Sequence, residues 1–169
     1  PWNHRGWHCG PGSKGSGNNT HIGVEMCEPA CIKYTSGSNF TCSDTATAKA
    51  VAKRTYEAAV ELFAMLCKQY SLNPTADGVI ISHKEGHSRG IASNHGDPEH
   101  LWTQLGMGYT MDGFRKAVKA AMSGTSGNTS GYTKIMGTAV ATAEQMKAYL
   151  KGKNPSVAQS VLDMIPLYL

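Results

Sequence analysis

Apolar side chains recur every three to four positions between residues 45 and 70, which predicts a long amphipathic helix. Ser43, Asp44 or Thr45 can cap the start of this helix, and Pro74 stops it. The face expected to turn inward carries Val51, Ala58, Ala59, Leu62, Phe63 and Leu66. A second helix is predicted over residues 111–122, and its inward positions are Phe114, Val118 and Ala121.

Strand patterns occur in three shorter segments. Residues 21–26 alternate, so that Ile22, Val24 and Met26 share one face and the polar or small residues share the other. Residues 79–82 form a continuous apolar run after a turn, which is typical of a buried strand. Residues 7–9 are a weaker strand candidate. Together with the helices, these strands predict an α/β fold.

The chain divides into three parts by composition. Residues 1–122 hold all of the elements above, and residues 123–131 contain only Gly, Ser, Thr and Asn, which is typical of a flexible linker. Residues 132–169 are too few to bury a core of their own, so we interpret them as the start of a second module.

Composition excludes several classes of protein. The chain has 169 residues and a net charge of +4 without any basic block, which is too dilute for a nucleic-acid binder. No apolar stretch is long enough to span a bilayer, so we expect no membrane insertion. We expect a monomer. The five cysteines show no standard zinc-knuckle spacing. The sequence does not decide whether they form disulfides or remain free thiols.

The candidate chemistry lies in a polar stretch, expected to be a loop, between residues 83 and 99. Four of the seven histidines fall within residues 83–100, and His83 follows the predicted buried strand directly. Histidine and aspartate are good zinc ligands, so a loop that folds back can bring Asp97 to His83. A solvated surface loop would have a similar composition. Trp102, just beyond, is expected in the core.

A second candidate is Glu25, on the polar face of the predicted strand at residues 21–26. A carboxylate near a metal can accept a proton from water, but the residues alone favour an exposed strand glutamate.

The order of motifs resembles a known family. It runs from Trp7-His8-Cys9-Gly10 through Asn18-x-x-His-Ile-Gly-Val-Glu25 and a long helix to Ser-His83 and Ala-Ser-Asn-His95-Gly-Asp97-Pro. Over roughly residues 1–122 this order is similar to that of zinc-dependent N-acetylmuramoyl-L-alanine amidases of the phage-endolysin and peptidoglycan-recognition type. The resemblance implies a mixed β-sheet flanked by helices, and a zinc ion in a groove above it.

The resemblance also implies residue roles. His83 matches the second zinc ligand and Asp97 the third, with His87 as an alternative to His83 because it fits the shorter spacing of simpler members. The first ligand is expected upstream of Pro1, so we expect the fold to be N-terminally incomplete and the chain alone to be weakly active or inactive. Glu25 matches the general base and His95 the group that stabilises the oxyanion. Trp7, His8 and Asn19 are expected to line the substrate groove.

The implied function is zinc-assisted hydrolysis of the amide between N-acetylmuramic acid and the L-alanine of the stem peptide. Peptidoglycan is the implied partner, and the implied location is outside the cell or at the cell wall, or release from a phage-infected host at lysis. The alternative is a peptidoglycan-binding module without catalysis. Residues 135–169 resemble the opening of a glucosaminidase domain, without its catalytic acid.

Overall fold

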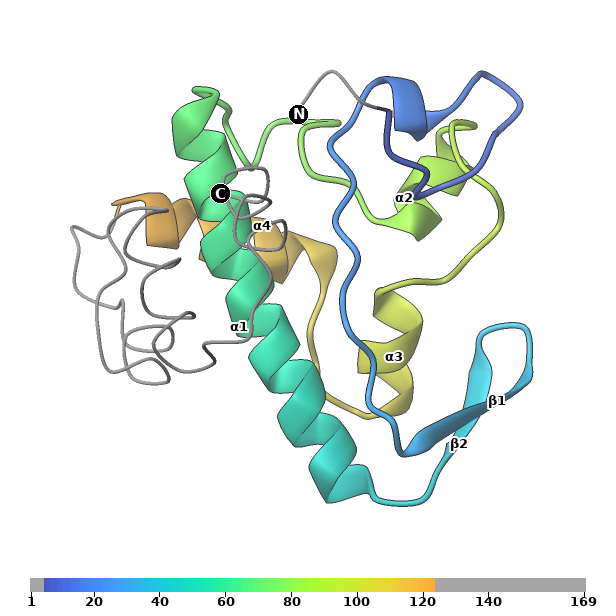
Figure 1. Ribbon diagram of the computed structural model, residues 1–169. Coiled ribbons are helices and arrows are strands. Elements are labelled where there is room, and N and C mark those ends of the chain that lie inside the picture. The colour runs from blue at the N-terminus through green and yellow to red at the C-terminus, as the bar shows by residue number, and fades with distance from the viewer. Residues whose placement is uncertain (1–4, 124–169) are drawn as a thin grey trace, which may run out of the picture. The chain divides into compact units, whose positions relative to one another are not determined.

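The computed structural model describes residues 5–123, whose helices and short strands belong to the α/β class (Figure 1). Apart from Ser123, the predicted linker at residues 123–131 and the predicted second module at residues 132–169 lie outside the described part of the chain. None of the helices in residues 5–123 has the length and apolar character needed to cross a membrane.

The long helix predicted from spacing is confirmed as α1, Thr45–Gln69. Of the three candidates, Asp44 is the residue that caps the helix. Its carboxylate accepts a hydrogen bond from the backbone N–H of Thr47 at 3.0 Å. Ala59 and Leu66 were predicted to face inward, and both are buried. Leu62 was predicted to face inward too, but it is 37% exposed.

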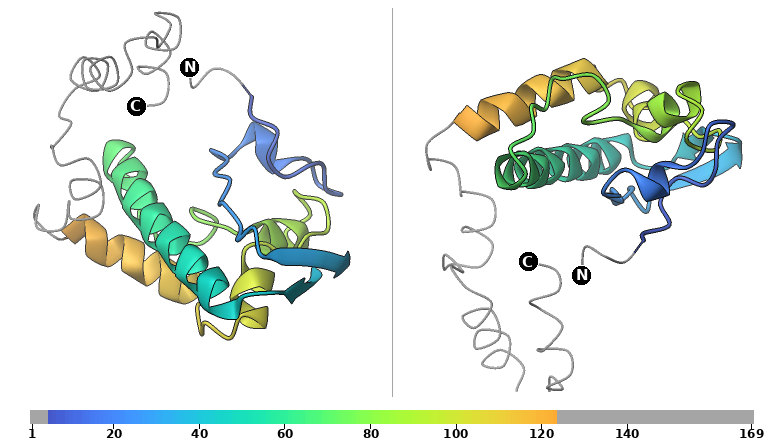
Figure 2. Two further views of the ribbon diagram at one scale, coloured as in Figure 1. Left: turned by 60° about the horizontal axis from the view of Figure 1, so that its bottom comes forward. Right: turned by 90° about the horizontal axis from the view of Figure 1, so that it is seen from above.

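The second predicted helix is confirmed as α4, Met111–Ser123, and it packs against α1 (Figure 2). Phe114 and Val118 are buried in this contact, as expected. Trp102 is 1% exposed and joins the same core, which confirms its assignment to packing. Burying such large side chains stabilises the unit by about 1.5–3 kcal/mol each, before the entropy cost of ordering them.

The sheet of the described residues is a two-stranded antiparallel hairpin, β1 Ile32–Ser36 and β2 Asn39–Cys42. Ile32 pairs with Cys42 and Tyr34 with Phe40. The turn includes Gly37 at φ 53°, a left-handed conformation that glycine adopts without steric cost. The sequence analysis missed this hairpin because its strands are short and mostly exposed, which leaves little apolar alternation.

The three predicted strand segments are wrong as strands. Residues 7–9, 21–26 and 79–82 form no β-ladder in the described structure, although Ile80 of the last segment is buried as expected. Alternation predicts an extended backbone with one buried face, but a strand also needs a neighbouring strand to bond its N–H and C=O groups.

The polar stretch after residue 82 is more structured than a loop. It contains α2, His83–Ser88, and leads into α3, Glu99–Gln104. His83 is therefore the first residue of a helix, and the prediction that it lies at the end of a strand is wrong. A short 3-10 helix, η1, Gly17–Asn19, precedes the extended segment that runs into the hairpin. In Figure 1 that segment lies between α1 on one side and α2 and α3 on the other.

Candidate functional site

A cavity of about 1080 Å³ is lined by segments that are distant in sequence. The extended segment at residues 20–28 forms one wall, and the apolar positions of α1 near Phe63 and Leu66 contribute to another. Polar side chains from several segments also line it. Among them are His8, Glu25, Glu28, Tyr34, His83, Asn94, His95, Asp97 and His100.

The N-terminus of α2 fixes the position of His83. The Ser82 hydroxyl accepts a hydrogen bond from the Glu85 N–H at 3.1 Å, and the Glu85 carboxylate accepts one from the Ser82 N–H at 3.1 Å. This reciprocal capping box satisfies two backbone donors that would otherwise lack partners. Arg115 of α4 then donates to the same Glu85 carboxylate and, at 2.9 Å, to the carbonyl of Ile80. The start of α2 is thus tied to the core.

Ser93 defines the orientation of the His83 ring. Its hydroxyl donates to the carbonyl of Cys9 at 3.1 Å and lies 3.1 Å from Nε2 of His83. A hydroxyl has one hydrogen, and the Cys9 carbonyl can only accept. With the hydroxyl hydrogen on the Cys9 carbonyl, the His83 Nε2 carries the proton that it shares with Ser93. In a neutral ring, this leaves a lone pair on Nδ1.

That Nδ1 atom faces Asp97. Its distance from Asp97 Oδ2 is 3.3 Å, and the His83 side chain is only 13% exposed. In that tautomer two acceptors face each other across this distance, and a cation between them, whether a proton or a metal ion, relieves their repulsion. Ligand atoms about 2.0–2.1 Å from a tetrahedral zinc ion lie about 3.3–3.4 Å apart, which agrees with the separation found here.

The pair therefore fits two positions of a zinc site, with Ser93 as the outer partner that holds the imidazole. A catalytic zinc site needs three protein ligands. Within residues 5–123, no group of three or more His, Cys, Asp or Glu side chains converges as a metal site would require.

The two other candidate histidines of this stretch are placed differently. His87 is exposed and turns its Nδ1 toward the Ala92 carbonyl, 3.3 Å away, and it is not part of the cavity lining. His95 is also exposed but lines the cavity, with its ring centroid 4.7 Å from that of His83. The geometry thus favours His83 over His87 as the partner of Asp97.

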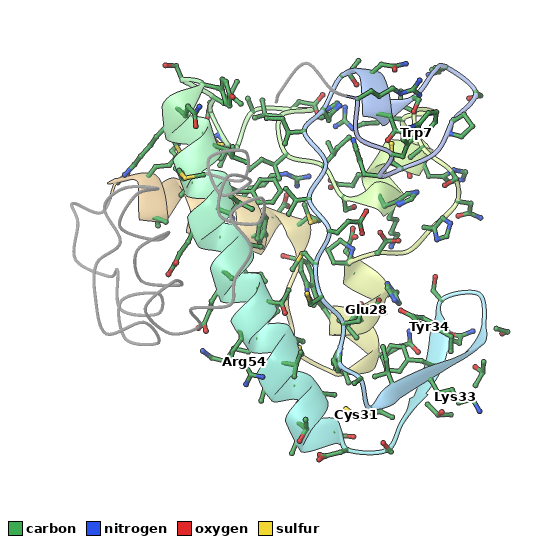
Figure 3. All side chains as sticks on the ribbon, viewed as in Figure 1. Trp7, Glu28, Cys31, Lys33, Tyr34 and Arg54 are labelled. Atoms are coloured by element: carbon green, nitrogen blue, oxygen red, sulfur yellow. The ribbon has the colours of Figure 1, made fainter. Side chains whose placement is uncertain are left out.

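The predicted base and groove residues are partly gathered at the cavity. Glu25 is exposed and lines it, and so does His8. Trp7 is 78% exposed, lies by α2 in Figure 3 and is not among the lining residues; it stacks under Arg5 at 4.1 Å. Asn19 is exposed and outside the lining as well. The roles of Trp7 and Asn19 in binding substrate stay predictions.

Asn18, the neighbour of Asn19, is a structural residue. Its side-chain oxygen accepts hydrogen bonds from the backbone N–H groups of His8 at 2.8 Å and Cys9 at 3.1 Å. The side chain is buried, so these bonds fix the loop that carries Cys9, whose carbonyl holds Ser93. Asn18 is thereby linked to His83 through a chain of hydrogen bonds that runs over Cys9 and Ser93.

The sequence analysis missed a second polar cluster on the cavity wall, Glu28, Tyr34 and His100. The Tyr34 hydroxyl donates to Glu28 Oε1 at 2.5 Å, and these two residues are labelled in Figure 3. The same hydroxyl lies 2.7 Å from His100 Nε2. Partial burial, together with the negative charges of Glu28 and Asp97, raises the pKa of Tyr34 above its usual range, so the phenol stays neutral. His100 belonged to the histidine-rich stretch, but nothing in the sequence pattern linked it to Glu28 or Tyr34.

Comparison with known proteins gives one match. The family model of N-acetylmuramoyl-L-alanine amidases matches residues 1–100, a segment that contains Glu25, His83, His95 and Asp97. No curated protein and no solved structure is similar enough to the chain to be matched. The matched segment is 100 of the 169 residues, and the chain belongs to the N-acetylmuramoyl-L-alanine amidase family.

Proposed function

We propose that this protein hydrolyses the amide between the lactyl group of N-acetylmuramic acid and the L-alanine of the stem peptide, with the assistance of zinc. The observation that carries this proposal is the 3.3 Å approach of His83 Nδ1 to Asp97 Oδ2, in a cavity that Glu25 and His95 also line. Membership of the amidase family supplies the substrate class.

His83 and Asp97 are the residues that would hold the metal. A bound zinc ion acts as a Lewis acid toward a carbonyl and makes water acidic enough to react near neutral pH. We propose that the third zinc ligand is a histidine on another strand, outside residues 5–123. A chain without that histidine would bind zinc weakly, because two ligands bind much less tightly than three.

Glu25 is the proposed general base. Its carboxylate is exposed on the cavity wall, where it can accept a proton from the attacking water and return it to the leaving amine. His95 is the proposed donor to the oxyanion that develops on the scissile carbonyl, a contribution of a few kcal/mol in comparable sites. Its exposed ring can reach this position from the loop between α2 and α3.

The substrate also suggests where the protein acts. Peptidoglycan lies outside the cytoplasmic membrane, so we propose that the protein is exported to the cell wall or reaches it when a host cell lyses. The glycan strand and the stem peptide are the proposed partners.

The test is the digestion of purified peptidoglycan by the chain and by a version extended at its N-terminus with the native preceding residues. We expect free N-terminal alanine and intact muramic lactyl groups from the extended protein, and loss of both after chelation. Release of reducing sugar ends without free alanine would contradict an amidase. Strong zinc-dependent release by the chain alone would contradict the placement of the remaining ligand.

The second candidate function, a peptidoglycan-binding module without catalysis, is favoured by the convergence of only two ligands in residues 5–123. Asp97→Ala separates the two functions when zinc content and wall pull-down are measured together in the extended protein. An amidase loses zinc and activity with this change. A binding module holds no zinc in either form and keeps its wall binding. Asp77→Ala is a matched control because Asp77 lies on the surface, paired with Arg89.

A further inference from the structure

A side-chain hydrogen bond joins the start of α2 to the start of α3. The Ser82 hydroxyl donates to Glu99 Oε1 at 3.0 Å, and Ser82 is only 5% exposed. Ser82 is the N-cap residue of α2, and Glu99 is the first residue of α3. A hydrogen bond to a carboxylate is stronger than one between neutral groups, so this bond is a firm connection between two helices.

Both ends of this bond lie beside a proposed zinc ligand. Ser82 directly precedes His83, and Glu99 follows Asp97 by two residues. The bond therefore ties together the two backbone segments that carry the ligands. The 3.3 Å separation of His83 Nδ1 and Asp97 Oδ2 depends on how these segments are held, because each side chain has only a few rotamers. A metal site tolerates little variation in such a separation.

Helix capping explains only part of this arrangement. Ser82 already caps α2 by accepting a hydrogen bond from the Glu85 N–H at 3.1 Å, which uses a lone pair of the hydroxyl and leaves its hydrogen for Glu99. Glu99 Oε2 is buried and has no hydrogen-bond partner among the described residues. A buried carboxylate oxygen without a partner costs stability, so stability alone does not account for the position of Glu99.

The other end of α3 is attached to a different part of the fold. Gln104 donates to the Ser38 carbonyl at 2.7 Å and accepts a hydrogen bond from the Phe40 N–H at 3.1 Å. These bonds hold α3 to the β1–β2 hairpin and do not involve Ser82. Gln104→Ala therefore loosens α3 without breaking the bond between Ser82 and Glu99, and it is a matched control.

We propose that Glu99 is a positioning residue of the zinc site, which acts through Ser82 to hold His83 and Asp97 at the separation that a metal ion requires. The proposal rests on the proposed function, because it concerns the same metal. The length of the Glu99 side chain is decisive, since the Ser82 hydroxyl needs only an acceptor within reach. Glutamine supplies that acceptor without a charge. Aspartate keeps the charge but is about 1.5 Å shorter.

The experiment compares Glu99→Gln with Glu99→Asp in the N-terminally extended protein. Zinc affinity is measured by competition with a chromophoric chelator, and circular dichroism checks the fold. We expect Glu99→Gln to bind zinc within about threefold of the wild type, and Glu99→Asp to bind it about tenfold more weakly. The visible spectrum of bound Co²⁺, which depends on ligand geometry, should change only in Glu99→Asp.

Two further measurements separate positioning from a general loosening of the fold. Gln104→Ala should leave the zinc affinity within about twofold of the wild type, since the bond near the ligands is intact. In a Ser82→Ala background, Glu99→Asp should cause no additional loss of zinc affinity, because the bond that it breaks is already absent.

Several results would overturn the positioning role and leave the amidase proposal intact. Equal zinc affinities for Glu99→Gln and Glu99→Asp would show that the reach of the side chain is irrelevant. A larger loss in Glu99→Gln would assign the effect to charge. A loss in Gln104→Ala as large as that in Glu99→Asp, or an undiminished effect of Glu99→Asp in the Ser82→Ala background, would also overturn it. If the extended wild-type protein binds neither zinc nor Co²⁺, the zinc-assisted function and the positioning role are both wrong.

Discussion

The carboxylate of Asp97 lies 3.3 Å from Nδ1 of His83, although fourteen positions separate the two residues in the chain. α2 and the turn that follows it reverse the direction of the chain. Ser93, which lies between the two residues in sequence, contacts Nε2 of His83 through its hydroxyl. A charge-assisted hydrogen bond is usually about 2.7–2.9 Å long, so the longer separation suits two ligands better than a donor and an acceptor.

The first prediction separates His83 from His87. His83→Ala should lower the zinc affinity of the extended protein by more than about 100-fold, since even the loss of an outer partner costs about 10–100-fold. His87→Ala should leave the affinity within about twofold, because its ring faces the Ala92 carbonyl outside the cavity. Zinc affinity is measured by competition with a chromophoric chelator. If zinc affinity fell more in the His87 variant than in the His83 variant, His87 and not His83 would be the metal ligand.

The second prediction concerns Ser93. Ser93→Ala removes the partner that fixes the His83 ring, and we expect zinc affinity to fall by about tenfold with the fold intact. Ser88→Ala is the matched control, since the Ser88 hydroxyl bonds only within α2, to the Lys84 carbonyl at 3.1 Å. Circular dichroism checks the fold, and chelator competition gives the affinity. Unchanged affinity in the Ser93 variant would show that His83 does not need this partner.

The third prediction concerns Arg115, which joins α4 to the start of α2. Arg115→Met should lower the free energy of unfolding by about 2 kcal/mol, because the Glu85 carboxylate and the Ile80 carbonyl lose a partly buried donor. Urea unfolding measures the change. Arg89→Met, which breaks the exposed pair with Asp77, should cost less than about 0.5 kcal/mol. Similar losses for both variants would argue against a special role for Arg115.

The fourth prediction concerns acid stability and Asp44. The N–H and hydroxyl of Thr47 hold the pKa of Asp44 below its usual value of 3.8, so the folded state favours the charged carboxylate. Its contribution to stability is present above pH 3.8 and is lost as the pH falls through the lower folded pKa.

Asp44→Asn keeps a good helix cap but cannot titrate. The stability of the wild-type chain should therefore fall more steeply than that of the variant between about pH 5 and pH 3. Urea midpoints at several pH values measure the two slopes. Parallel curves would mean that Asp44 titrates alike in the folded and unfolded states.

The sequence alone identified α1 and α4, since helical spacing and capping are local properties that a few turns of chain contain. It also supplied the candidate metal ligands, in the short stretch from His83 to Asp97, and the order of motifs that resembles the family. For these features the relevant neighbours are close in the chain.

The tertiary structure decided the rest. The segments at residues 21–26 and 79–82 have strand-like patterns, but a ladder needs backbone partners from elsewhere in the chain. The choice of His83 over His87 depends on Ser93 and Cys9, and the meeting of Glu28, Tyr34 and His100 depends on three distant segments. Hydrogen bonds have directions, and only the folded arrangement determines which donors and acceptors face each other.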